Sequence, residues 1–443
     1  MPFQVSPGVL VREVDLTNVV PAVSTSIGAI AGAFEKGPVS EITAVSSEEE
    51  LVRLFGKPNG SNFETFFTAS NFLQYGNALR VVRAQSGVTN AMSGGSGLLI
   101  KSDTHYQDNF SAGEASSGEW GARTAGTHGN SLGVSMCTSP EAFEETLTAA
   151  GEVSGTPAAG ATTVNVSAGG GSAGAGGAKY NVGDIVFFQE ADGQQYEVTA
   201  INNDALTIRQ LDNPNGGGLK SALADGTDVR RRWAFYDLFD SAPGTSTYAT
   251  SKNVSDDEMH IVVYDKTGDI SGFRKDTAGE RTNSVLETYA FLSQHPNAKT
   301  PQGGTNYYPD VIFKQSSFVY WLDHPSVLSN AGTARTSGQA YAHGDGTTGQ
   351  IEFALSGGTD DYAVTVGELD SAYNEFADAE TVDVNLIMGG TSPAGADGTQ
   401  HATNLIDIAE KRKDVVVFIS PRRADVVNIA NSTTQASNVK TFF

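Results

Sequence analysis

Hydrophobic residues follow two alternating patterns near the start of the chain. Residues 24–34 and 77–84 are apolar runs of strand length, and between them residues 46–56 and 62–76 space their apolar residues as one face of a helix does. Ser46 precedes Glu49 by three positions, which predicts a capping box at the first helix, and Gly56 marks its end. In the second helix, which we expect to stop at Gly76, we predict a buried stripe made of Phe63, Phe66, Phe67, Phe72 and Leu73.

The same alternation returns near the other end of the chain. Residues 364–390 predict a helix followed by a strand, with Leu369, Tyr373 and Phe376 on the inner face of the helix. Residues 399–423 repeat this order and predict a buried strand over 415–419. Helices that alternate with apolar strands are typical of an α/β layer with a mostly parallel sheet, so we expect both ends to build one such layer.

Between these ends the composition changes to Gly, Ser, Thr and short alternating runs. Residues 153–178 are almost low-complexity, and residues 180–211 predict three strands separated by Asp-Gly and Asn-Asp turns. The predicted fold class is therefore α+β multidomain, with a discontinuous α/β core interrupted by a β-rich domain that carries a small outer β module. We predict an extended arm over 1–23, the core over 24–87 and 356–443, the β-rich domain over 88–151 and 228–355, and the module over 152–227.

Charge excludes some classes of partner. Lys and Arg number 28 against 51 Asp and Glu, a net charge of −23, which argues against direct nucleic-acid binding and against binding to anionic membranes. The basic triplet Arg230, Arg231 and Arg232 is predicted to be solvated, or to pair with acids of another subunit, rather than to bind phosphate. No apolar run approaches about 18 residues, so membrane insertion is not expected. Cys137, the only cysteine, is predicted to be a buried apolar residue of a protein made in a reducing cytoplasm.

The sequence contains no recognisable set of catalytic residues. Ser172 lies in a formal G-x-S-x-G match, but the match falls within a Gly/Ala tract without the flanking strand and helix that a nucleophile elbow needs. None of the seven histidines has a second histidine four residues away, as a helical metal site requires. We therefore predict no enzymatic activity, no cofactor and no metal. Acidic positions at turns are predicted to be solvated: Asp225, Asp256, Asp257, Asp345, Asp360 and Asp361.

The first residues of the chain predict a strand without an evident partner. Pro7 and Gly8 form a turn signal, and apolar β-formers follow up to Leu16. No hairpin turn follows, and Pro21 indicates an extended connector. From these residues alone, the strand can pair at the edge of its own sheet or with another copy of the chain.

Several long stretches, in order, resemble one family. They are SPGVLVREVD, GAFEKGPV, LVRLFGKP, NFLQYGNALRVVRA, AGTHGNSLGV, LSGGTDDYAVTVGEL, FADAETVDVNLIMGG and DVVVFISPRRADVV. With these stretches the chain resembles the contractile tail sheath proteins of T4-like bacteriophages. The resemblance is strong over 1–90 and 350–430, patchy between them, and absent from the Gly/Ala tract.

The resemblance implies that the opening strand leaves its own subunit and adds to a sheet of a neighbour. It also implies a helical sheath of identical subunits around a tail tube protein, with baseplate and tail terminator proteins at its ends. Such a sheath belongs to the virion, assembles in the host cytoplasm and contracts to drive the tube through the host envelope during genome ejection. The residues of the implied intersubunit arm are Pro7, Gly8, Val9, Leu10, Val11, Arg12, Glu13, Val14, Asp15 and Leu16.

Sheaths of this type usually continue past the match to DVVVFISPRRADVV, whereas this chain ends at Phe442 and Phe443. We therefore expect a truncated form that is soluble, largely monomeric and unable to contract. Two alternatives stay open at this point. The first is the sheath of a phage-tail-like bacteriocin or contractile injection system, which shares the fold. The second is a β-rich surface adhesin, which would explain the glycines but not the α/β ends.

Overall fold

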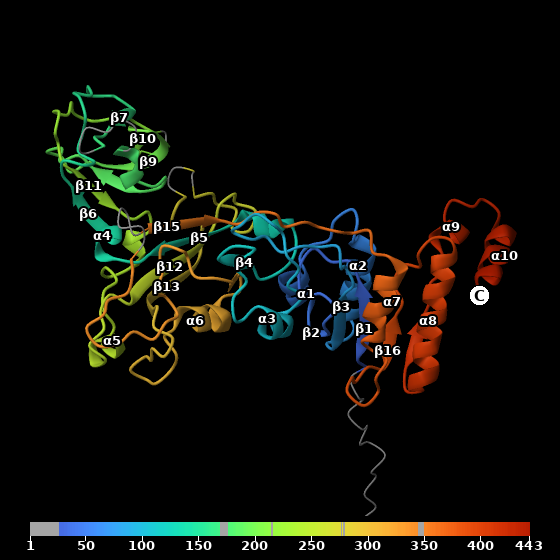
Figure 1. Cartoon of the computed structure of the whole chain (residues 1–443). Helices are drawn as coiled ribbons and strands as arrows, with labels where there is room; N and C mark the ends of the chain where they lie inside the picture. The colour runs from blue at the N-terminus through green and yellow to red at the C-terminus, as the bar shows by residue number, and fades with distance from the viewer. Residues whose placement is uncertain (1–25, 169–175, 214–215, 276, 278–279, 344–349) are drawn as a thin grey trace, which may run out of the picture. The chain divides into compact units, whose positions relative to one another are not determined.

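The computed structural model describes residues 26–168, 176–213, 216–275, 277, 280–343 and 350–443 (Figure 1). The chain divides into two compact units. Among the described residues, the first unit contains 26–35, 40–85 and 362–443, and the second contains those of 36–39 and 86–361. Both ends of the chain therefore contribute to the first unit.

The first unit is built on a five-stranded sheet with the order β17-β16-β1-β3-β2. All neighbours in this sheet are parallel except β2 and β3, so the prediction of a mostly parallel sheet is confirmed. Each residue of β1, the central strand, is buried, as expected for a strand covered on both faces. The strands of this sheet are β1 Gly28–Gly32, β2 Thr43–Val45, β3 Leu79–Arg83, β16 Leu386–Met388 and β17 Val416–Phe418.

Helices cover the two faces of this sheet, as Figure 1 shows with α1 and α2 on one side and α7 and α8 on the other. Ile30 and Val81 pack with Leu51 of α1 and Phe66 of α2. Residues of the opposite face, such as Ala31 and Val82, pack with side chains of α7 and α8. The helices of this unit are α1 Glu48–Phe55, α2 Phe63–Leu73, α7 Val366–Asn374, α8 Ala396–Arg412, α9 Arg423–Val426 and α10 Ser432–Phe442.

The start of α1 differs from the prediction by one residue. The N-cap is Ser47, whose hydroxyl accepts a hydrogen bond from the backbone N–H of Glu50 at 3.2 Å. The carboxylate of Glu50 accepts from the backbone N–H of Ser46 at 2.9 Å, so Ser46 takes part but is not the cap. The end at Gly56 is confirmed, and its φ of 82° is a backbone conformation that glycine adopts without strain.

Two predictions of burial in the first unit were wrong. Phe63 and Phe67 are 41% and 48% exposed, because α2 presents Phe66, Ala69 and Ser70 to the core instead. The strand predicted over 415–419 is also not buried. It is an edge strand, and Val416 is 57% exposed.

Close packing of α2 on β1 depends on the glycines of β1. A Cβ atom at Gly28 would lie 2.6 Å from Cζ of Phe72, and one at Gly32 would lie 2.8 Å from Cγ2 of Thr65. These distances are shorter than van der Waals contact. The small residues of this strand therefore set how near the helix can approach.

Replacing Gly28 with valine should lower the free energy of unfolding by about 1 to 3 kcal/mol, because the added side chain displaces the ring of Phe72. Denaturant unfolding followed by circular dichroism would measure this. Gly60→Val is the matched control, since a Cβ at Gly60 would meet no atom within 4 Å. Equal stability of the two variants would contradict this account of the packing.

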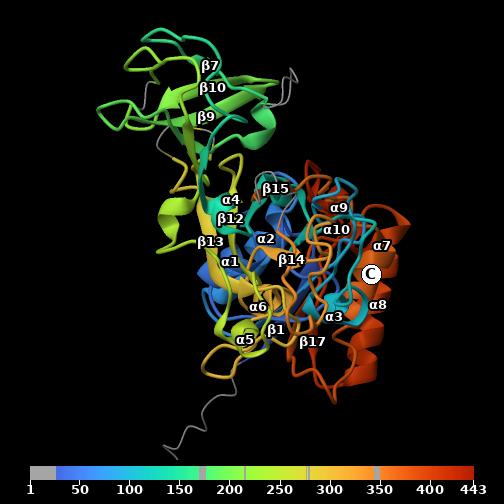
Figure 2. The same cartoon turned by 60° about the vertical axis from the view of Figure 1, so that its left-hand side comes forward.

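The described residues of the second unit form three antiparallel sheets. Their orders are β13-β12-β5-β15, β14-β4 and β6-β11-β8-β9-β10-β7, the last being the six-stranded sheet, of which Figure 2 labels β7, β9 and β10. The first two sheets consist of β4 Trp120–Ala122, β5 Leu132–Cys137, β12 Glu258–Asp265, β13 Val285–Ser293, β14 Val319–Trp321 and β15 Gln350–Ala354. The helices of the unit are α3 Asp103–Asn109, α4 Pro140–Phe143, α5 Thr247–Ser251 and α6 Tyr308–Gln315.

The six-stranded sheet contains the three strands predicted over 180–211. Its strands are β6 Glu144–Leu147, β7 Thr163–Asn165, β8 Ile185–Phe187, β9 Gln195–Asn202, β10 Ala205–Gln210 and β11 Val229–Arg232. Strands β6 and β11, which lie on either side of residues 152–227 in sequence, pair with each other in this sheet. The mixed helix-and-sheet class is confirmed, and the four-part division of the chain stays a prediction.

Candidate functional site

The residues predicted to form the intersubunit arm lie outside the described part of the chain. They belong to residues 1–25, as Ser172 belongs to 169–175 and Asp345 to 344–349. The arm therefore stays a prediction. The described residues offer a hollow, an exposed apolar surface and buried charged groups for examination.

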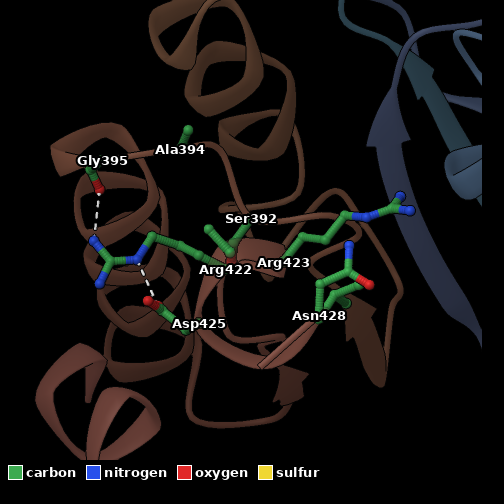
Figure 3. Close-up of a pocket in the computed structure, with 9 residues that line it drawn as sticks. Ser392, Ala394, Gly395, Arg422, Arg423, Asp425 and Asn428 are labelled. Carbon is green, nitrogen blue, oxygen red and sulfur yellow. Dashed lines mark hydrogen bonds and ion pairs between the residues drawn. The ribbon is translucent and has the colours of Figure 1, made fainter. Parts of the chain in front are cut away.

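A hollow of about 560 Å³ lies beside the carboxyl ends of β16 and β17 in the first unit (Figure 3). Crevices at this edge of parallel sheets often bind ligands, so its charged groups matter. The hollow is lined by Ser392, Ala394, Gly395, Arg422, Arg423, Ala424, Asp425, Val427 and Asn428.

Both arginines of this hollow have partners within the chain. Arg422 donates to Oδ2 of Asp425 at 2.7 Å and to the carbonyl of Gly395 at 3.0 Å, as the dashed lines in Figure 3 show. Its guanidinium also lies 5.1 Å from the ring centre of Phe442. Arg423 pairs with Glu64 of α2. These bonds hold α9 and α10 in place, and they leave the cations of the hollow already neutralised by the chain's own acids.

An exposed apolar surface lies on the same unit, on the sheet face that α1 and α2 cover elsewhere. The parallel register places Leu386 beside Val416 and Met388 beside Phe418. Ile387 and Val417 point to the opposite face, where they pack with α7 and α8. Val416 and Phe418 are exposed, Phe418 by 55%, whereas Leu386 and Met388 are half-buried and Met388 packs against the core under α1 and α2. We call these four residues, Leu386, Met388, Val416 and Phe418, the apolar strip.

The prediction of a solvated basic triplet holds only for Arg230, which is exposed. Arg231 is completely buried, and its guanidinium donates to Glu145 at 3.1 Å and to the carbonyl of Glu141 at 2.8 Å. Arg230 and Arg232 both pair with Glu144. The antiparallel register of β11 and β6 places these charges opposite one another, so the pairing lies within the chain rather than between subunits. The acidic pair Glu144 and Glu145 is the sequence signal that could have indicated this.

Asp257 also differs from the prediction of a solvated turn. It is completely buried and accepts hydrogen bonds from the backbone N–H and the hydroxyl of Ser246, both at 2.8 Å, and from the hydroxyl of Ser293. Asp225 does lie in an exposed turn. Cys137 is buried as predicted, and burial raises the pKa of its thiol, so the thiol stays protonated.

The described residues contain no group of three or more His, Cys, Asp or Glu side chains placed to hold a metal ion. In the part of the chain that the structure describes, every helix is too short or too polar to cross a membrane. His260, for example, is buried between aromatic rings, accepts from the backbone N–H of Phe291 and contacts the carbonyl of Ser241, which is a structural role.

Comparison with known proteins identifies the class. Residues 25–84 match the family model described as the N-terminal region of domain III of the tail sheath protein Gp18. The tail sheath protein of Vibrio phage KVP40 is 46% identical over 78 residues, which are 18% of this chain and 12% of that protein. The tail sheath proteins of Enterobacteria phage T4 and Salmonella phage ViI are each 26% identical, over 454 and 443 residues, and each alignment includes 96% of this chain.

Solved structures of two sheath tail proteins are also similar to this chain. The protein from Listeria innocua has a TM-score of 0.37 and 10% identity, with 92% of this chain and 50% of that chain covered. The protein from Desulfitobacterium hafniense has a TM-score of 0.33 and 9% identity, with 94% and 58% covered.

The sequence matches point to one class of proteins, the tail sheath proteins of bacteriophages. The chain is related to the tail sheath proteins of phages such as T4, and the recognition made from the sequence is thereby confirmed. The chain spans 63% and 61% of the length of the T4 and ViI relatives.

Proposed function

We propose that this chain is a structural subunit of a contractile phage tail sheath. In this role it polymerises around a tail tube and contracts to drive the tube through the host envelope during genome ejection. One observation carries the proposal: the similarity to two tail sheath proteins extends over 96% of this chain. No catalytic step is needed, because such a machine works by exchanging one packing of its subunits for another.

The subunits would be linked by strand addition through the arm, residues 7–16. In strand addition, main-chain hydrogen bonds supply affinity and alternate side chains supply register. The turn signal before this segment and the Pro-containing connector after it suit a strand that leaves its own subunit. Identical copies related by a rotation that does not close then build a helical tube. The further partners of the proposal are the tail tube, baseplate and tail terminator proteins, with no direct contact to nucleic acid.

The proposal is tested on virions with antibodies raised against this chain. Gold-labelled antibody should decorate the whole length of the outer tail tube in negative-stain micrographs, and the decorated tube should become shorter and wider after contraction. Decoration of tubes without an attached capsid would instead indicate a phage-tail-like bacteriocin or an injection system. Decoration confined to fibres or to the host cell surface would contradict a sheath role and favour an adhesin.

The arm is tested by placing a photo-crosslinking amino acid at Leu10 of the sheath chain in assembled tails. Irradiation should join two copies of the chain, giving a product of twice the subunit mass. The same amino acid at Asp192, in an exposed turn of the six-stranded sheet, is the comparison position. A crosslink from Leu10 that maps only to the same copy would show that the strand pairs within its own subunit.

The apolar strip suits burial against a neighbouring copy in such a tube. Phe418→Ser should slow or prevent tube assembly, while changing the free energy of unfolding by about 1 kcal/mol or less because the side chain is already largely exposed. Ile406→Ser is the matched control, since Ile406 is 45% exposed on α8, on the opposite side of the sheet. Turbidity or sedimentation of assembling subunits measures the effect. Unaltered assembly of the Phe418 variant would remove the strip from the interface.

A further inference from the structure

Charged residues gather beside β8 and β11 of the six-stranded sheet. Asp184 precedes β8, and Arg231 lies on β11, so both belong to this sheet. Lys275 and Glu352 come from the other side, from the segment between β12 and β13 and from β15. The approach is close, because a Cβ atom at Gly183 would lie 3.1 Å from Cε of Lys275. All these residues belong to the second unit.

Two polar atoms at this place are buried without a hydrogen-bond partner among the described residues. Asp184 is completely buried, and its Oδ2 accepts from the backbone N–H of Asn181 at 2.7 Å, but its Oδ1 has no partner there. The Nε of Arg231 is also buried without a hydrogen-bond partner among the described residues, although the other nitrogens of its guanidinium donate hydrogen bonds. A buried polar atom without a hydrogen-bond partner lowers the stability of the folded state, and the cost is larger when the group is charged. The protonation of Asp184 therefore matters for stability.

The remaining charges of the cluster balance without Asp184. Arg231 pairs with Glu145, and Lys275 pairs with both oxygens of Glu352 at 3.0 Å. Each pair is neutral as a whole. A protonated Asp184 leaves this balance intact, whereas an ionised Asp184 adds an uncompensated negative charge inside the protein.

The other titratable groups that face this place do not supply a compensating charge. Tyr180 and Cys137 are buried, and burial raises the pKa of each, so both stay neutral. Tyr264 donates its hydroxyl proton to Glu352 at 2.8 Å, and burial likewise keeps it protonated. Glu197, on β9, is already paired with Arg209 at 2.8 Å.

Burial also raises the pKa of Asp184 from 3.8 to about 7, while nearby Arg231 acts in the opposite direction. Because the folded pKa lies above the unfolded one, the folded state holds this proton between about pH 4 and pH 7 and the unfolded state does not. Stability from this group is therefore fully present below the unfolded pKa and is lost as the pH rises through about 7.

We propose that this cluster is a pH-sensitive joint, in which neutral Asp184 holds the six-stranded sheet against the segments that carry Lys275 and Glu352 and ionised Asp184 loosens this contact. Ionisation creates a charge in a buried site that Arg231, Lys275 and Glu352 influence, and loosening the contact allows water to solvate that charge. The joint is a property of this chain alone and does not depend on a role in a sheath.

Hydrogen exchange measured by mass spectrometry tests the joint on the whole chain. Protection of the β6, β8 and β11 amides, corrected for the intrinsic effect of pH, should fall about tenfold or more between about pH 6 and about pH 8.5. In Asp184→Asn, which mimics the protonated form, this protection should stay constant. Asp192→Asn removes the same charge from an exposed turn of the same sheet and should behave as the unchanged chain does. Identical profiles for Asp184→Asn and the unchanged chain would overturn the proposal.

A second variant tests the charge balance and does not require the Asp184 variant to fold. Glu352→Gln leaves Lys275 without its anion, so an ionised Asp184 becomes the compensating charge. The loss of protection should then disappear from the range between about pH 6 and about pH 8.5, because Asp184 is already ionised at the lower end. A loss that occurs at the same pH as in the unchanged chain would contradict the joint.

Discussion

Asp265→Ala is expected to lower the free energy of unfolding by about 3 to 5 kcal/mol. Asp265 is the last residue of β12, and its buried carboxylate organises the loop that follows. It accepts hydrogen bonds from the backbone N–H groups of Gly268, Ile270 and Ser271 at 2.9, 2.9 and 2.6 Å. The hydroxyls of Ser131 and Ser271 also donate to it. Removing the carboxylate leaves all these donors without their acceptor.

Urea unfolding of the two variants Asp265→Ala and Asp269→Ala would measure the effect. Asp269 lies in the same loop but is exposed, and it accepts from the hydroxyl of Thr267, so its replacement should cost about 0.5 kcal/mol or less. If both variants lose the same stability, the buried carboxylate does not organise the loop.

Acid should act on the same residue. Burial alone would raise the pKa of Asp265, but the hydrogen bonds from Ser131, Ser271 and Ile270 outweigh it and hold the pKa below the usual 3.8. Since the folded pKa is the lower one, this stabilisation is present above about pH 4 and is lost as the pH falls below 3.8 toward the folded pKa. Part of the acid unfolding of the unchanged chain should therefore be missing in Asp265→Ala.

Arg412→Ala is expected to cost about 3 to 4 kcal/mol in the first unit. Arg412 ends α8 and is almost completely buried. Its guanidinium donates to the carbonyls of Phe376 and Val382 at 2.6 and 2.9 Å, and its Nε donates to Asp414 at 2.9 Å. It therefore ties the connection between α7 and β16 to the end of α8. Without it, buried carbonyl groups lose their donor.

Lys411→Ala is the matched control for this prediction. Lys411 is the preceding residue of α8, carries the same charge and is exposed, so its removal should cost about 0.5 kcal/mol or less. Arg412→Lys should recover only part of the stability, because an ammonium group cannot reach all the acceptors of the planar guanidinium. Thermal or denaturant unfolding would measure the order of stability of these variants. An equal loss of stability for Lys411→Ala and Arg412→Ala would contradict the prediction.

Much of the local structure follows from the sequence. The apolar spacing around Leu51 and Phe66 predicts α1 and α2, and Gly56 predicts where α1 ends. The Asn-Asp turn between β9 and β10 was also predictable, because Asn203 adopts a positive φ that asparagine tolerates. The comparisons confirm the relationship to phage tail sheath proteins. The arm was predicted on the same evidence and stays a prediction.

Burial could not be predicted from spacing alone. Phe66 and Phe67 lie on the same helix, yet only Phe66 reaches the core. Val416 belongs to an apolar run and is exposed because its strand lies at the edge of the sheet. Arg231 belongs to a run of charges and is buried because β6 places Glu145 opposite it.

By itself, the sequence determined which segments form helices and strands, where several of them end, and which family the chain resembles. These properties depend on neighbouring residues and on long ordered matches. Only the tertiary structure decided which apolar faces are covered and which charges are buried together, including the cluster of Asp184, Arg231, Lys275 and Glu352. The physical reason is that burial and charge pairing depend on strand order and on which elements pack over them, and residues distant in the chain set both.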